Sequence, residues 1–222
     1  TFLFGKRVLY FLKEEVKGML KKLASDALGL SDIGKIISPA DYDKTDADDY
    51  VMHEDQEKIY FLIKTKQDEY CFTNLALIHV DGDSAVSSKR MLKRYPYAQY
   101  KISNVFLETA GRVDLDVEIK FTVGSLNFDI DVRKDQLELL KDLYKSLVSI
   151  SEMTHKNEIY ERLAVQSLEK ATQTLQNAHT NENELANTYE NLTKFSFEWL
   201  MSSYEKYHVK DFGAVFEKYI NN

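Results

Sequence analysis

The chain has little of what breaks or cross-links a fold. Its 222 residues include one cysteine, two prolines and eight glycines. One cysteine cannot form an internal disulfide, and this suits a reducing compartment such as the cytoplasm. The scarcity of proline and glycine, together with fourteen tyrosines and twelve phenylalanines, predicts helices and strands joined by short turns. No apolar run reaches the length of about 18 residues that would predict a transmembrane helix.

Charge is unevenly spread along the chain. Residues 1–23 hold six basic and two acidic side chains and so carry +4, which leaves −11 on the rest of a chain with a formal charge of −7. Nucleic-acid binding depends on positive charge that neutralises phosphates. The charge of −11 beyond residue 23 therefore argues against a nucleic-acid partner. The five histidines show no pairwise metal spacing and no glycine-flanked serine beside them. We therefore expect a protein that is not an enzyme, with no catalytic residues, no metal and no cofactor.

The basic N-terminal segment carries one apolar stripe. Its members recur at helical spacing, with lysines opposite: Val8, Leu12, Val16, Met19 and Leu23. Two readings stay open. The helix packs on its own protein or a sister subunit, or it lies on an anionic membrane surface and makes the protein membrane-peripheral.

The segment DYDKTDADDY, residues 41–50, resembles a calcium-binding loop. With Asp41 in the first ligand position, Asp46 replaces the turn glycine and Met52 replaces the bidentate glutamate. Without that turn and that ligand the calcium cage does not close. We expect an acidic, solvated connector that ends an N-terminal region of residues 1–50.

From residue 58 the apolar period changes to two. The runs KIYFLIKT, EYCFT and LALIHV predict strands, and Asp81-Gly82 is a strong signal for a tight hairpin turn. Cys71 lies inside this apolar stretch, so we expect a buried thiol. His79, Asp81 and Asp83 could suggest a metal site, but alternating residues on one strand edge give only three ligands and no second histidine.

The acidic stretch ETAGRVDLDVEIKF, residues 108–121, is explained by strand register. With Gly124-Ser125 as a two-residue loop, apolar residues pair with each other: Phe121 with Phe128, Ile119 with Ile130, and Val117 with Val132. The other side pairs polar residues: Lys120 with Asp129, Glu118 with Asp131, and Asp116 with Arg133. The carboxylates are therefore predicted to form the solvent face of an antiparallel hairpin and not a catalytic group.

After the last strand the period is helical to the C-terminus. Asp135 is a candidate N-cap for a helix that ends near Ile150, and a second helix is expected from about 155 to 177. Residues 178–183 form a polar hinge, and Asp211 caps a short last segment. Strands closed by one helix indicate a small barrel or sandwich.

The aromatic-rich run FSFEWLMSSYEKY needs a partner surface, because two antiparallel helices alone cannot bury their apolar stripes. That partner is the β-domain or another copy of the chain. Buried aromatic side chains dominate association energy. The expected oligomer or partner-binding anchors are Tyr189, Leu192, Phe195, Phe197 and Trp199.

Three ordered motifs, FTNLALIHVDG, KRYPYAQYKIS and FLETAGRVDLDVEIKF, resemble the bacterial pleckstrin-homology (PH) domain family. The segment SDALGLSDIGKIISP and the helical tail resemble the YvbH type, whose C-terminal extension is called an oligomerisation region. The resemblance implies an α+β fold: a PH-like antiparallel seven-stranded barrel over residues 51–150, capped by one helix. It also implies a helical hairpin at 152–222 for oligomerisation, no known catalytic residues, and homo-oligomers.

PH folds of eukaryotes hold phosphoinositides with lysines and an arginine between the first two strands. That loop here reads TKQDEY, so the lipid-binding pattern is not carried over. A basic cluster lies elsewhere and is a candidate anion-binding site: Lys89, Arg90, Lys93 and Arg94. Two readings stay open: a solvated loop or strand face that pairs with acidic residues of a neighbouring subunit, or a contact for an anionic headgroup or acidic partner. We expect a cytoplasmic, non-catalytic module that forms homo-oligomers through its barrel and helical tail, with a peripheral membrane protein as the alternative.

Overall fold

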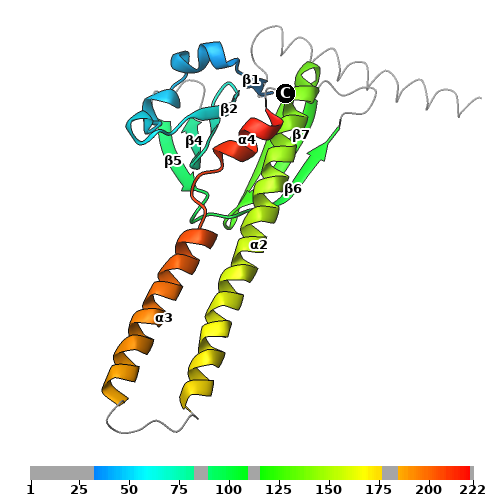
Figure 1. Cartoon of the computed structure of the whole chain (residues 1–222). Coiled ribbons are helices and arrows are strands. Elements are labelled where there is room, and N and C mark those ends of the chain that lie inside the picture. The colour runs from blue at the N-terminus through cyan, green and yellow to red at the C-terminus, as the bar shows by residue number, and fades with distance from the viewer. Residues whose placement is uncertain (1–32, 83–89, 110–115, 177–184, 221–222) are drawn as a thin grey trace, which may run out of the picture.

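Two antiparallel sheets lie against the first third of a long helix in the computed structural model, which describes residues 33–82, 90–109, 116–176 and 185–220 (Figure 1). The first sheet has the order β1 (Lys35–Ile36), β2 (Ile59–Lys64), β3 (Glu69–Thr73), β4 (Ala76–Gly82) and β5 (Arg90–Pro96). The second contains β6 (Ile102–Glu108), β7 (Asp116–Val123) and β8 (Leu126–Arg133). The helices are α2 (Leu137–Gln176), α3 (Leu185–Tyr207) and α4 (Gly213–Tyr219).

The sheets do not close into one barrel among the described residues. An isolated parallel bridge between Gly34 and Val132 connects the start of the first sheet to the second. The expected antiparallel strands and following helix are present, but the closed seven-stranded barrel is replaced by these two sheets and a two-residue β1. The main core fills the space between the sheets and α2, where Phe72, Phe121 and Leu140 are fully buried.

The predicted register of the β7–β8 hairpin is confirmed. Val117 pairs with Val132 and Phe121 with Phe128, and the apolar side of β7 is buried throughout. Gly124 adopts a φ of 62°, which a glycine accepts without strain. On the outer side the Lys120 ammonium contacts carboxylates of three strands, so their charges raise its pKa. The acidic stretch is a paired, wet sheet face.

The acidic connector is not a solvated linker, which corrects the sequence expectation. Residues 39–55 form three short 3-10 turns, η1 (Pro39–Lys44), η2 (Asp48–Tyr50) and η3 (His53–Asp55). Ala47 and Val51 are buried against the outer face of the first sheet. The carboxylate of Glu69, itself buried, accepts the backbone N–H of Ala47 at 2.8 Å and pairs with Lys64. The connector buries the outer face of this sheet, which explains why strands β3 and β4 are nearly continuous apolar runs.

The connection between β4 and β5 is longer than predicted. Asp81 and Gly82 belong to β4 and pair with Met91 and Arg90, so the two-residue turn expected there is wrong. A Cβ on Gly82 would lie 2.6 Å from the carbonyl oxygen of Gln67. Close backbone approach therefore explains this glycine better than a tight turn does.

Helix α2 runs without a break where two helices were expected. Its 40 residues span about 60 Å, and the sequence SEMTH around residue 153 contains no helix breaker. The Thr154 hydroxyl donates to the Ile150 carbonyl at 3.0 Å, as in a continuous helix. Near residue 153 the apolar face of α2 changes direction, because the helix extends beyond the sheets from that point. The predicted Asp135 N-cap is also wrong: that carboxylate binds Arg133 and lies in the 3-10 turn η4 (Lys134–Gln136).

Helix α4 returns from the tail to the β-domain and completes its core (Figure 1). Phe212 and Phe216 are buried, and Phe212 donates its backbone N–H to the Asn74 carbonyl at 2.8 Å. The Asn74 amide in turn donates to Asp211 at 2.7 Å. Asp211 also accepts the N–H of Gly213, the first residue of α4, as its predicted capping role requires. The last residues thus pack with the domain and not with the helical hairpin.

Candidate functional site

Two antiparallel helices project from the β-domain and form the most exposed apolar part of the described chain (Figure 1). We call residues 152–176 of α2 together with α3 the arm. Few contacts hold its helices together: the rings of Tyr160 and Tyr207 lie 5.5 Å apart, and the Trp199 indole N–H is 3.4 Å from the Ala164 carbonyl oxygen. The arm therefore leaves much of its apolar surface open to another molecule.

The apolar residues of α3 divide into two flanks, the first of which includes half-buried Leu192. Leu192, Phe195 and Trp199 recur at helical spacing, and the rings of Phe195 and Trp199 stack at 6.2 Å. This flank borders α2, because Trp199 reaches the carbonyl of Ala164. Phe197 follows Phe195 by two positions, so it points to nearly the opposite side of the helix. The five predicted anchors do not form one stripe.

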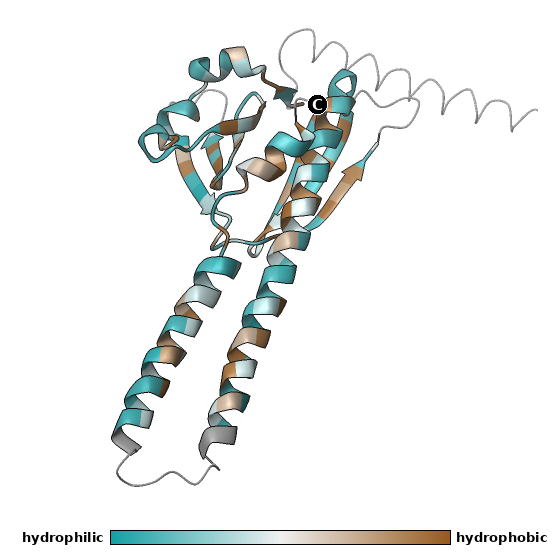
Figure 2. Cartoon of the chain, viewed as in Figure 1, coloured by the Kyte–Doolittle hydropathy of each residue, from teal (hydrophilic) through white to brown (hydrophobic). Residues whose placement is uncertain are grey.

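The second flank of α3 lies on the other side of the helix from Phe195 and Trp199, and its last residue, Tyr204, also lines a cavity beside α2 at the base of the arm. It consists of residues at three-to-four-residue spacing, all of them exposed: Phe197, Leu200, Met201 and Tyr204. Phe197 is 65% exposed and Tyr189, about two turns earlier in α3, is 72% exposed. Figure 2 shows apolar patches interrupting the polar surface of both arm helices. We call Phe197, Leu200, Met201 and Tyr204 the outer flank.

Sequence reasoning missed three of the four outer-flank residues: Leu200, Met201 and Tyr204. Their spacing from Phe197 was visible in the sequence as i, i+3, i+4 and i+7. The sequence prediction instead followed the aromatic residues Phe195 and Trp199, which lie on the other flank of α3. Exposed Leu163 and Val165 extend the apolar surface onto α2.

The base of the arm is fixed to the domain by polar and aromatic contacts. Lys101 in the loop before β6 forms an ion pair with Glu158 of α2. A cavity of about 310 Å³ lies between this loop and the two helices, lined in part by Tyr97, Thr154 and Tyr207. The ion pair and the ring contact within the arm set the direction in which the helices leave the domain.

Residues 27–151, more than half of the chain, match the family model described as Bacterial PH domain. The chain belongs to this family. Residues 162–222 match a second model, described as YvbH-like oligomerisation region. That region contains all of α3 and α4 and the end of α2. The resemblance read from the sequence motifs is confirmed for both parts.

Relatives of the PH-domain chain are found in Bacillus subtilis (strain 168). The chain is 69% identical over 204 residues to Uncharacterized protein YvbH, a match that covers 92% of this chain and 100% of the relative. It is 32% identical over 97 residues to Uncharacterized protein YjqA, covering 42% of this chain and 74% of that protein. A solved structure, that of a PH domain containing bacterial protein from Exiguobacterium sibiricum 255-15, shares 53% identity with a TM-score of 0.79. It covers 86% of this chain and 100% of that chain, which establishes the PH-like fold with its long helix and further helices.

The basic cluster of the PH domain is split by strand alternation. Arg90 and Arg94 lie on the outer side of β5, where Arg90 pairs with Asp46 at 3.0 Å and Arg94 makes two hydrogen bonds of 3.0 and 3.1 Å to buried Glu57. Lys93 points to the other side and pairs with Asp81. Each of these three cations is neutralised by a carboxylate of the same chain, and Lys89 lies outside the described residues.

The membrane alternative draws no support from the described residues of the PH-domain chain. The amphipathic stripe of residues 6–24 lies outside them, as does the polar hinge at 178–183. Within the described ranges, no helix combines the length and apolar character needed to cross a bilayer.

Cys71 is fully buried, as expected, and burial raises the pKa of its thiol well above the usual value. A thiol in this state is a poor nucleophile. Its neighbours on the outer face of the first sheet are apolar side chains of the second core cluster. Cys71 is therefore a packing residue.

Proposed function

We propose that the chain is a non-catalytic PH-like interaction module that forms homo-oligomers through its arm. The observation that carries this proposal is the outer flank, a continuous set of large apolar side chains left exposed on a helix that the domain does not cover. Exposed apolar patches of this kind mark association sites in soluble proteins. The matched oligomerisation region, residues 162–222, includes the whole of this flank.

A second copy of the chain is the occupant that fits best. The arm is amphipathic, with charged residues such as Glu198 and Glu205 on the side of α3 that the apolar flanks leave free. Burying a half-exposed large side chain contributes about 2 kcal/mol at about 25 cal/mol per Å². Four outer-flank residues from each of two copies would thus offset the cost of association, about 4–15 kcal/mol.

The β-domain offers a second contact for the same assembly, through the edges of its two sheets. Phe106 on edge strand β6 is 61% exposed, and Met91 on edge strand β5 is exposed as well. Edge strands with apolar side chains favour pairing with another chain. We propose that these edges join the arm in building the oligomer, as the sequence expectation of a barrel contribution requires.

The test removes the outer flank without removing the helix. The variant Phe197→Gln/Met201→Gln/Tyr204→Gln keeps helix-forming residues and deletes the apolar surface. The matched control, Glu198→Gln/Ser202→Gln/Glu205→Gln, places the same residue at three exposed positions on the polar side of α3, beside the outer flank. Light scattering of both variants and of the unmodified chain measures mass per particle.

The proposal predicts that the outer-flank variant falls towards the chain mass of 25.8 kDa while the control keeps the mass of the unmodified chain. Circular dichroism should show the same helix content in all three. An unchanged mass in the outer-flank variant would place assembly elsewhere. Equal loss in both variants would show that α3 tolerates no surface change, which also contradicts the proposal.

A further inference from the structure

A polar cluster lies on the inner face of the first sheet, at its rim. In the β3–β4 pair, Tyr70 lies opposite His79, so the next residues on that face, Asp68 and Asp81, are brought opposite each other. Lys93 of β5 lies opposite His79 on the other side. The sheet thus gathers one imidazole, two carboxylates and one ammonium from three adjacent segments.

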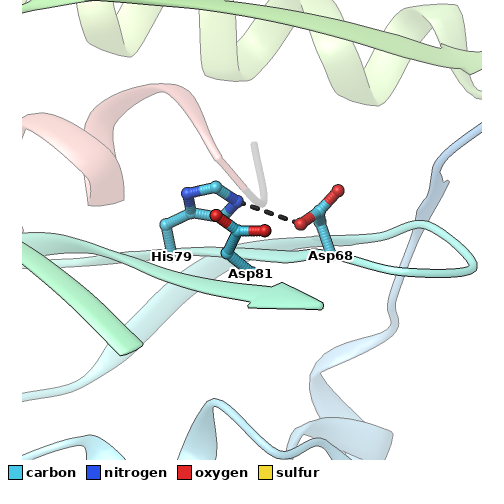
Figure 3. A group of neighbouring side chains, drawn as sticks. All are labelled: Asp68, His79 and Asp81. Carbon is cyan, nitrogen blue, oxygen red and sulfur yellow. Dashed lines mark hydrogen bonds and ion pairs between the residues drawn. The ribbon is translucent and has the colours of Figure 1, made fainter. Parts of the chain in front are cut away.

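The side chains of Asp68, His79 and Asp81 converge on one point. Figure 3 shows them rising from the same face of the strands, with Asp68 reaching His79 from the turn before β3. The Nε2 atom of His79 is 3.2 Å from a carboxylate oxygen of Asp68, and one ligand atom from each of the three residues lies within 4.8 Å of the others. Around a tetrahedral ion with bonds of about 2.0–2.1 Å, neighbouring ligand atoms are about 3.3 Å apart. The 3.2 Å between His79 and Asp68 already matches that spacing, and the Asp81 carboxylate lies within 4.8 Å of both.

The imidazole is held in place by aromatic contacts. Its ring stacks on Tyr70 with centroids 4.6 Å apart and meets the edge of Phe128, which comes from the second sheet. These contacts hold the ring with its Nε2 atom beside Asp68, and an imidazole nitrogen is a common metal ligand.

Lys93 shows that the cluster already attracts a cation. Its ammonium forms an ion pair with Asp81. The ammonium is about one-third exposed at the rim and can swing to solvent. With the ammonium displaced, the two carboxylates can balance the charge of a divalent cation.

We propose that Asp68, His79 and Asp81 bind a divalent transition-metal ion, with zinc as the best fit. One nitrogen and two oxygen ligands suit zinc and leave at least one coordination position open for water or a ligand. The sequence argued against a metal here because His79, Asp81 and Asp83 on one strand edge give only three ligands and no second histidine. The structure supplies Asp68 from the adjacent turn instead, which puts the third ligand across the strand pair.

The experiment is isothermal titration of the full chain with zinc chloride. The unmodified chain should bind one ion, and His79→Gln and Asp68→Asn should each weaken binding by about tenfold or more. Lys93→Met should strengthen binding, since it removes the competing ammonium. The control is His53→Gln, which removes an exposed histidine 3.1 Å from one carboxylate, that of Asp48.

The control variant should bind zinc as the unmodified chain does. Circular dichroism of each metal-free variant checks its fold. A second readout needs no substitution: zinc added to the isotopically labelled unmodified chain should shift the amide signals of Asp68, His79 and Asp81 first. Absence of stoichiometric binding, equal weakening by His53→Gln, or amide shifts centred elsewhere would each overturn the proposal.

Discussion

Replacing Phe216 by alanine should destabilise the β-domain, although this residue belongs to the last helix of the chain. Phe216 is fully buried, and its ring stacks on Tyr60 of β2 with centroids 5.3 Å apart. Tyr97 closes the same pocket at 6.3 Å. Deleting a buried phenylalanine ring costs about 3–5 kcal/mol, through lost transfer energy and the cavity left behind. That is a large share of a typical stability of about 5–15 kcal/mol.

The assay is urea unfolding followed by circular dichroism at one fixed protein concentration, because self-association adds to apparent stability. With a slope of about 2 kcal/mol per molar urea, the midpoint of the Phe216→Ala variant should fall by about 2 M. Ala214→Gln, at an exposed position of the same helix, should leave the midpoint nearly unchanged. A Phe216→Ala midpoint equal to that of the unmodified chain would refute the inclusion of α4 in the core.

Three further results follow from buried or strained groups. Arg94→Met should lower the free energy of unfolding by about 3 kcal/mol in thermal melts, because it leaves buried Glu57 unpaired. Arg90→Met, on a half-exposed pair, should change it by less than about 1 kcal/mol, and equal losses would contradict this. Cys71 should resist iodoacetamide at about pH 8 until the chain is unfolded, and labelling of the native chain would count against its burial. Gly124→Ala should cost about 1 kcal/mol, since its φ is 62°, and unchanged stability would argue against this turn.

Local patterns were enough to predict the β7–β8 hairpin. Its register follows from apolar alternation on both sides of a two-residue turn, and every pair needed for the prediction lies within 18 positions. The bacterial PH family was likewise visible in ordered motifs of the same region. Such features depend on neighbours in sequence, which is why they could be read before the structure.

Long-range contacts could not be predicted in the same way. The docking of α4 depends on Asn74 and Asp211, which are 137 positions apart, and no local signal joins them. Helix α2 was divided in two because its apolar face turns from the sheets towards α3 near residue 151. A change of partner along one helix produces the same sequence pattern as a break between two helices.

Strand alternation explains why the basic cluster and the cluster of Asp68, His79 and Asp81 are arranged differently from what the sequence suggested. Lys93 and Arg94 are adjacent in sequence and were expected to act together, yet neighbours in a strand point to opposite faces. The same rule, applied to the strand pair, would have placed Asp68 across from Asp81. That step required the β3–β4 register, which the bare sequence left open.

The account rests on the outer flank as the association surface, and a tryptophan at position 201 tests it most directly. Trp199, the only tryptophan of the chain, lies on the flank that borders α2, so the reporter variant is Trp199→Phe/Met201→Trp. The measurement is the emission maximum of the tryptophan at position 201 as the protein is diluted through the range in which its particle mass falls. The account predicts a shift to longer wavelength over that range, because the arms separate and water reaches the indole. A constant emission maximum while the mass falls would contradict it.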